Sequence, residues 1–493
     1  MKWLNNILLT VASVWMLTAC SSSDDDTGMM QQADVSSRYI NLAIAVAGGN
    51  GSTTRALPVG GEDGDGREAG FERENAVTGI TLILYEDAAG INTSSNPDIQ
   101  FVAYYPVSRV TKDADTRVEA TYETGNQLVP HNAIDFTKTY HAIVVANANL
   151  TGSITIGSKL NDVRDKTRVD TYIGDATKPA SSCGSFVMSS EQDNNTLNFA
   201  ALGVKTQDAA GDYYYDMSSQ TLVIERMAAR IDFWSKNSNG YKTSAENAAY
   251  TIPGYEYDVT SSTDKFVVTG IVPFNIVNGH ATYGNEYIIK RIRTDIDDAA
   301  TTSYVSDETT TNYVMDPQTT AKTGAASLTS ALESVYSLIG DGSKLENTTF
   351  NPYFHSVESM RVAGGMSTIE TKENLVVAYP MENTLNAGSE LYYYATGIAI
   401  VGYYYVNGTG TGTRYVYLGY LRHQGEADSY DIMPYTTPLS ATDVLGSSLA
   451  MKFGIVRNNI YRVWIGSIDE KGEMELKIKV KKWDPYTHSF IYM

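Results

Sequence analysis

The residues of this 493-residue chain that could act in catalysis or bind a metal are few and are not grouped. The six histidines show neither a His-Glu-x-x-His motif nor any other spacing of paired ligands; they are His131, His141, His280, His355, His423 and His488. Cys183, in "SSCGS", has no histidine near it in the sequence, and no Gly-x-Ser-x-Gly motif occurs. The sequence therefore predicts no enzyme, no metal site and no cofactor.

Two glycine-rich stretches share features with ligand-binding loops. Asp63 and Asp65 in "EDGDGREAG" are spaced like the start of a calcium loop, but the later bidentate acid and the flanking helices are missing. A connector is favoured there, with calcium as the alternative. The stretch "NGTGTGTR" (407–414) lacks the lysine and the helix of a phosphate loop and lies between tyrosine-rich segments, so it predicts a hairpin turn.

The first residues have the layout of an export signal. Lys2 precedes an apolar run over 7–17, which is too short to span a bilayer. The "LTAC" that follows resembles a bacterial lipobox, which implies removal of residues 1–19 and acylation of Cys20. The next residues, "SSSDDD" (21–26), resemble the acidic tract of surface lipoproteins in the Bacteroidetes or form a solvated tether.

Strand patterns bounded by Gly, Asn, Asp and Ser dominate the rest of the chain. Alternation is strict over 474–480, which predicts a half-buried antiparallel strand. The best helical pattern covers 329–342. We expect an all-β protein of two antiparallel β-sandwich domains with a few short helices, divided into 56–221 and 222–493. Strands are predicted at 79–87, 140–148, 222–234, 265–274, 392–406, 414–422, 460–468 and 474–483.

Composition supports an exported β protein. The chain has 35 tyrosines against 12 phenylalanines, and tyrosine suits strands that are half buried. Its formal net charge of −20, spread along the chain, would repel nucleic acid and anionic lipid. With two cysteines in all, and Cys20 assigned to lipid, no internal disulfide is expected.

The segment "YINLAIAV" (39–46) is a strand pattern directly behind the export signal. Ile40, Leu42, Ile44 and Val46 share one face and should enter a sandwich core along one edge. Burial of four such side chains is worth roughly 6–12 kcal/mol before opposing terms. Loss of this strand would leave an apolar gap that a strand from another copy could fill.

The loop after this strand contains a bond suited to proteolysis. Arg55 and Ala56 lie in "AGGNGSTTRALPVGG" (47–61), where small residues offer nothing to bury. A cut between them would release Cys20 and the strand together. Arg38, Arg67 and Arg73 are alternative sites, but a cut at Arg38 would leave the strand in place, and one at Arg73 would remove more than the gap requires.

The chain ends with "KKWDPYTHSFIYM", in which Pro485 interrupts pairing and apolar side chains follow at Phe490, Ile491 and Tyr492. Either this segment is a strand donated to a neighbouring molecule, or it closes a sheet of its own chain.

These features together resemble the type V pilins of Bacteroidales, in particular the Mfa-like shaft subunits of the minor fimbrium. The resemblance rests on the order of the lipobox, "RALPVGGEDGDGREAGFERENAVTGITLILYED" (55–87), "AIVVANAN" (142–149), "FVMSS" (186–190), "ERMAARIDF" (225–233), "YPMENT" (379–384) and "GIVRNNIYRVWIGSI" (454–468). It implies transthyretin-like sandwich domains and an outer-membrane lipoprotein precursor. It further implies cleavage by an Arg-specific protease and polymerisation by donor-strand exchange.

Carried onto this chain, the resemblance makes Cys20 the lipidated residue and 20–55 a propeptide that contains the displaced strand. Arg55–Ala56 becomes the maturation bond, and the C-terminal residues become the donor. The implied product is an extracellular fimbria that supports adhesion and biofilm formation, with pilin subunits as partners and a host or bacterial surface ligand. The alternative is a monomeric surface lipoprotein that binds a glycan or a host protein and keeps its N-terminal strand.

Overall fold

The computed structural model describes residues 36–46, 67–69, 72–86, 96–110, 121–130, 132–164, 186–190, 195–202, 204–243, 252–274, 355–365, 373–380, 396–423, 430–434, 455 and 457–484. Several predicted features lie outside these residues: Cys20, Arg55, Ala56, Asp63, Asp65, Cys183, the helix at 329–342, and Phe490, Ile491 and Tyr492.

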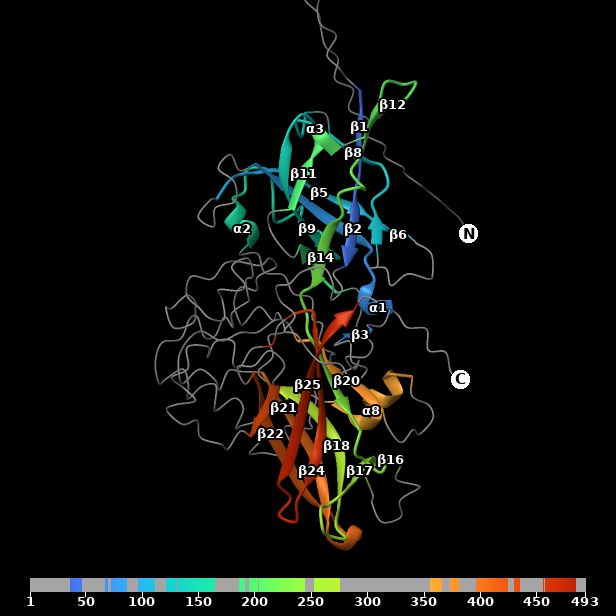
Figure 1. Cartoon of the computed structure of the whole chain (residues 1–493), viewed down its shortest axis with the longest axis vertical. Helices are drawn as coiled ribbons and strands as arrows, with labels where there is room; N and C mark the ends of the chain where they lie inside the picture. Colours follow the sequence, from blue (N-terminus) through green and yellow to red (C-terminus); the bar gives the residue numbers. More distant parts are fainter. Residues whose placement is uncertain are drawn as a thin grey trace, which may run out of the picture.

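The described residues form mostly β-structure in two halves that lie end to end along the long axis (Figure 1). In the first half, a four-stranded sheet has the order β12 (Val204–Gln207), β13 (Tyr213–Asp216), β1 (Arg38–Asn41) and β8 (Gln127–Val129). A nine-stranded sheet has the order β5 (Ile99–Pro106), β4 (Gly79–Tyr85), β9 (Thr139–Ala146), β10 (Met188–Ser190), β14 (Leu222–Arg226), β2 (Ala43–Val46), β7 (Thr121–Glu123) and β6 (Ser108–Val110), with β11 (Asn195–Asn198) paired to β9.

The described residues of the second half also form two sheets. The five-stranded sheet has the order β20 (Asn374–Ala378), β15 (Arg230–Trp234), β24 (Asn459–Ile468), β25 (Met474–Asp484) and β3 (Arg67–Ala69). The seven-stranded sheet has the order β16 (Tyr241–Lys242), β17 (Gly254–Asp258), β18 (Lys265–Phe274), β21 (Gly397–Tyr405), β22 (Thr413–His423) and β23 (Tyr430–Pro434), with β19 (His355–Ser356) paired to β18.

The described helices are short, as the sequence predicts. They are α1 (Glu72–Asn75), α2 (Leu160–Arg164), α3 (Phe199–Leu202), α8 (Val357–Ala363) and the 3₁₀ turn η4 (Val406–Gly408). Within the described part of the chain, no helix has the length and apolar character needed to cross a membrane. The turn η4 links β21 to β22, which pair antiparallel, so the predicted hairpin at 407–414 is confirmed.

The predicted strands are present, with one correction. The continuous strand expected over 222–234 is two strands, β14 and β15, because the chain leaves the first half and enters the second between them. The buried apolar residues follow the same division. One core cluster contains residues up to Ala228 and three side chains from the second half, and the other cluster begins at Ala229. The change of core therefore falls a few residues after the division predicted at 221/222.

The sheets are mixed, whereas the sequence predicts antiparallel ones. Among the described strands, four pairs are parallel: β1 with β13, β2 with β14, β15 with β24, and β3 with β25. Each joins segments that are far apart in the sequence, so a pattern within one segment cannot show its direction. The alternation predicted for 474–480 is present in β25: Met474, Leu476, Ile478 and Val480 are half-buried or buried, and each residue between them is more exposed than its neighbours.

Candidate functional site: the slot of the N-terminal strand

The N-terminal strand lies in the interior of both sheets of the first half. Residues 38–41 form β1, between β13 and β8, and residues 43–46 form β2, between β14 and β7. The prediction that this strand forms one edge of one sheet is therefore wrong. We call the space between β13 and β8 and between β14 and β7 the strand slot. In Figure 1 the strand runs down through the upper half, with β1 above β2.

We call β13 and β14 one wall of the slot and β8 and β7 the other, and the strands of the two walls run in opposite directions. On one side, β1 and β2 lie parallel to β13 and β14, with Tyr39 opposite Tyr214 and Ile44 opposite Leu222. On the other side they lie antiparallel to β8 and β7, with Ile44 opposite Tyr122. The strand therefore has a hydrogen-bonded neighbour on each side in both sheets.

Leu42 marks the point where the strand passes from one sheet to the other. Its amide donates to Thr124 Oγ1 at 3.0 Å, and its carbonyl accepts from the Thr124 amide at 3.1 Å. Beside it, the Asn41 carbonyl accepts from the Met217 amide at 2.8 Å. The backbone therefore stays hydrogen-bonded across the break, as buried peptide groups require.

The side chains of the strand fill the core of the first half. Ile40, Leu42, Ile44 and Val46 have no exposed surface, and Ala43 and Ala45 are also buried. The strand β2 is therefore covered on both faces, which explains why its inward and outward positions are both apolar.

The beginning of the strand is held by polar and aromatic contacts. The Ser37 amide donates to Asp212 Oδ1 at 2.8 Å, and the Tyr213 amide donates to the Ser37 carbonyl at 2.8 Å. The rings of Tyr39 and Tyr214 are stacked, with centroids 4.9 Å apart. These contacts fix the register of β1 against β13.

Removal of the strand would expose edges on four other strands at once. β8, β13, β7 and β14 would each lose the ladder on the side that faces the slot. Unpaired edges of this kind pair readily with another extended chain. At about 1.5–3 kcal/mol for each large apolar side chain, the buried surface alone gives a strong reason for the slot to be filled.

The alternative cleavage sites lie within secondary structure. Arg38 begins β1 and is paired on both sides, Arg67 begins β3 and is paired with Lys482, and Arg73 lies in α1. A protease needs an extended, unpaired segment of backbone, so cleavage at these three arginines would require local unfolding.

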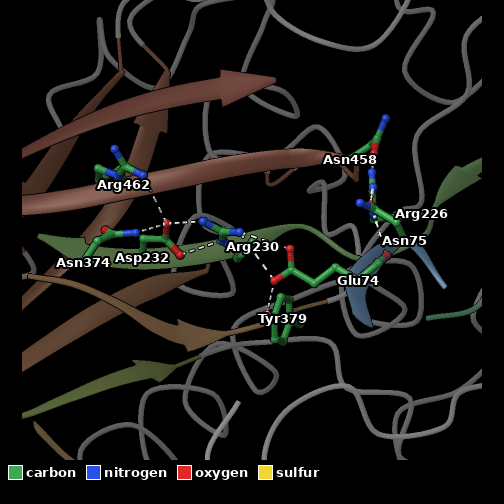
Figure 2. A network of polar contacts seen from close by, with 9 residues as sticks. All are labelled: Glu74, Asn75, Arg226, Arg230, Asp232, Asn374, Tyr379, Asn458 and Arg462. Atoms are coloured by element: carbon green, nitrogen blue, oxygen red, sulfur yellow. Dashed lines mark hydrogen bonds and ion pairs between the residues drawn. The ribbon is translucent and has the colours of Figure 1, made fainter. Parts of the chain in front are cut away.

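A buried network of charged groups joins the two halves next to the slot (Figure 2). Arg230 donates from Nε and Nη2 to both carboxylate oxygens of Asp232, at 2.8 and 2.7 Å, and its Nη1 lies 3.1 Å from Glu74 Oε2. Asn374 Nδ2 donates to Asp232 at 2.8 Å, and the Tyr379 hydroxyl donates to Glu74. Glu74 and Asp232 have no exposed surface.

The charges in this network are mutually stabilised. Burial opposes ionisation of Asp232, but Arg230, Arg462 and Asn374 together outweigh it and hold the pKa of the carboxyl below its ordinary value. Burial also raises the pKa of the Tyr379 hydroxyl well above its ordinary value, so this group stays protonated and can donate to Glu74. We assign the network a structural role, because its groups bind one another.

The network was not predicted from the sequence. Arg226, Arg230 and Asp232 stand in the apolar stretch "LVIERMAARIDFW", and charged residues at inward strand positions are a signal of buried ion pairs. Glu74 carries no comparable signal. Among the described residues, no group of three or more His, Cys, Asp or Glu side chains is arranged to hold a metal ion.

No protein-family model matches the chain, and no curated protein is significantly similar to it. It is similar to the crystal structure of a candidate cell adhesion protein from Parabacteroides distasonis, with 12% identity and a TM-score of 0.43 over 91% of this chain and 98% of that one. It is also similar to the C-terminally truncated tip fimbrial protein Mfa3 from Porphyromonas gingivalis, with 10% identity and a TM-score of 0.36 over 91% of this chain and 100% of that one.

A third similar structure is that of a candidate cell adhesion protein from Bacteroides eggerthii, with 13% identity and a TM-score of 0.34 over 91% of this chain and 97% of that one. With identities and TM-scores this low, these likenesses carry no argument about the function of the chain.

Proposed function

We propose that the chain is the precursor of a structural subunit of a cell-surface fimbria. It is exported as a lipoprotein through Cys20, cleaved at Arg55–Ala56 by an Arg-specific protease, and polymerised when a strand from another copy takes the place of residues 38–46. Both halves are transthyretin-like sandwiches in this proposal, and the C-terminal Phe490, Ile491 and Tyr492 belong to the donated strand. The precursor is held on the outer membrane, and the product is an extracellular shaft.

One observation carries the proposal: the N-terminal strand is interior to two sheets. In the sequence it lies between the predicted export signal and the predicted cleavage site. Its partners in the parallel ladders lie far away in the sequence, and β1 and β2 follow one another through both sheets. A single cut beyond Val46 therefore frees a whole strand without cutting any of its neighbours.

The location of the arginines supports a cut at Arg55. Arg67 and Arg73 belong to β3 and α1, which are hydrogen-bonded to the second half and to the junction between the halves. A cut upstream of both leaves these contacts intact, whereas a cut at Arg73 would divide α1 and separate β3 from Glu74.

The experiment is to determine the N-terminus and assembly state of the protein purified from cells that make wild type, Arg55→Ala or Arg67→Ala. We expect wild type and the matched control Arg67→Ala to begin at Ala56 and to form ladders in mild detergent. Arg55→Ala should stay a lipidated monomer. Mature wild-type molecules that all retain a diacylated Cys20 would refute the proposal and favour the monomeric lipoprotein.

The donor segment is tested separately by deleting residues 485–493, which begin directly after β25. The truncated chain should be cleaved normally but should not elongate. Normal polymers from the truncated chain would place the donor strand elsewhere.

A further inference from the structure

The short helix α1 lies at the end of the strand slot, where the two halves meet. Figure 1 shows α1 below the end of β2, and the backbone and side chains of Glu74 and Asn75 are buried there. It follows the predicted cleavage site in the sequence, so it remains in the chain after a cut at Arg55.

The helix binds both walls of the slot. On the β7 side, the Tyr122 hydroxyl donates to the Asn75 carbonyl at 2.6 Å. On the β14 side, Arg226 Nε donates to the Glu74 carbonyl at 3.0 Å, and Arg226 Nη2 donates to the Asn75 side chain. Tyr122 lies opposite Ile44, and Arg226 lies two residues beyond the partner of Val46.

These contacts cross the width of the slot. In a sheet, two strands with one strand between them are about 10 Å apart, which is twice the usual spacing. Two adjacent residues of α1 are bonded to strands on opposite sides of this gap. We name Glu74, Asn75, Tyr122 and Arg226 the α1 bridge.

The bridge is also fixed from the second half. The Glu74 carboxylate accepts from Arg230 at 3.1 Å and from the Tyr379 hydroxyl, and Arg226 Nη1 donates to Asn458 Oδ1 at 2.7 Å (Figure 2). Arg230 is in turn paired with Asp232 at 2.7 Å. The position of α1 is therefore set by contacts that do not involve the N-terminal strand.

We propose that the α1 bridge holds β7 and β14 one strand apart while the slot is empty, and so keeps the slot ready to accept a strand. The inference rests on the proposed function. With β1 and β2 in place, the strand itself keeps the walls apart and the bridge is redundant. Without them, two exposed edges of the same molecule would otherwise pair with each other.

The consequence is a difference between the filled and the empty states. If β7 and β14 pair with each other when the bridge is absent, only a fraction of the empty molecules can accept a strand. The apparent affinity for the strand is then the intrinsic affinity multiplied by that fraction. A substitution in the bridge should therefore weaken strand uptake more than it destabilises the uncleaved chain.

The test uses Tyr122→Phe, which removes the hydroxyl bonded to Asn75. The matched control is Tyr140→Phe. The Tyr140 hydroxyl is also hydrogen-bonded to the backbone, since it accepts from the Asp135 amide at 2.8 Å, but it is not part of the bridge. The full-length chain is cut with an Arg-specific protease, which is then inhibited, and the released fragment is removed by dialysis in urea. After return to buffer, uptake of a fluorescent synthetic peptide of residues 36–46 is followed by anisotropy.

We expect wild type and Tyr140→Phe to bind the peptide equally, and Tyr122→Phe to bind it roughly threefold to tenfold more weakly, the range for one lost hydrogen bond. Melting of the uncleaved chains should differ little between the two variants. A second variant, Arg226→Lys, should weaken uptake in the same direction.

The outcomes separate the two proposals. Equal uptake by Tyr122→Phe and Tyr140→Phe would overturn the bridge and leave the proposed function standing. The inference would also be overturned if Tyr122→Phe lowered the free energy of unfolding of the uncleaved chain by as much as it weakened the free energy of peptide binding. The bridge would then be an ordinary structural contact. No uptake by wild type would overturn the proposed function and the bridge together.

Discussion

Replacement of Ile44 by alanine should destabilise the precursor and leave the mature subunit unchanged. Ile44 is fully buried, lies in the middle of β2, and is paired with Leu222 on one side and Tyr122 on the other. Truncation of a buried isoleucine costs about 2–5 kcal/mol, since the removed carbons leave a cavity. The ladder hydrogen bonds are unaffected because they are made by backbone groups.

The cost appears as a lower melting temperature of the first half. At about 2–4 °C for each kcal/mol in a unit of 150–250 residues, the precursor transition should fall by roughly 4–20 °C. The mature subunit purified from the same cells should melt as wild type does, because the proposed cut at Arg55 removes residue 44. Differential scanning calorimetry of both forms measures the two transitions.

A matched control is Ile224→Ala in β14, which pairs with Val46 and is equally buried. This residue stays in the subunit, so the substitution should lower the melting temperature of the precursor and of the mature form alike. A mature Ile44→Ala subunit that melts as low as its precursor would refute the removal of the strand.

Three further predictions concern residues of the second half, Asp232 and Gly402. Asp232→Ala should destabilise the chain by about 3–5 kcal/mol, because it removes the carboxylate that binds buried Arg230 through two hydrogen bonds and leaves Glu74 as the remaining carboxylate beside it among the described residues. Since the pKa of Asp232 is lower in the folded state, its stabilisation is complete above the unfolded value of about 3.9 and is lost as pH falls through the folded value. Urea titrations should therefore show a smaller loss of stability below pH 4 for Asp232→Asn than for wild type, and an equal loss would contradict the assignment. Gly402→Ala should cost about 1–3 kcal/mol by the same measurement, since the added carbon would lie 2.5 Å from the Phe266 ring, whereas Gly152→Ala, which meets nothing within 4 Å, should be neutral.

The parts of the fold that were predictable are those that depend on neighbouring residues. The alternation over 474–480 and the apolar run at 79–85 each lie within one segment, and both form strands. The turn at 407–414 was also predictable, because Asn407 and Gly408 adopt positive φ values that these residue types favour. Local patterns therefore give the elements.

What depends on distant residues was not predictable. The path of residues 38–46 through two sheets is set by partners about 175 positions later, and the change of sheet at Leu42 depends on its two bonds to Thr124. No local pattern carries this information, so the same residues predict an edge strand. The position of Glu74 likewise depends on Arg230, which lies in another segment.

The direction of β1 and β2 determines how the first half responds to mechanical force. Ladder hydrogen bonds lie across the strands, so tension applied at Ser36 along the strand axis loads the bonds to β13, β8, β14 and β7 in shear and at the same time. Hydrogen bonds that are loaded together require a larger force to break than hydrogen bonds that are broken one after another. The uncut strand would therefore act as a firm anchor under tension, and its exchange would be easier by stepwise replacement from one end.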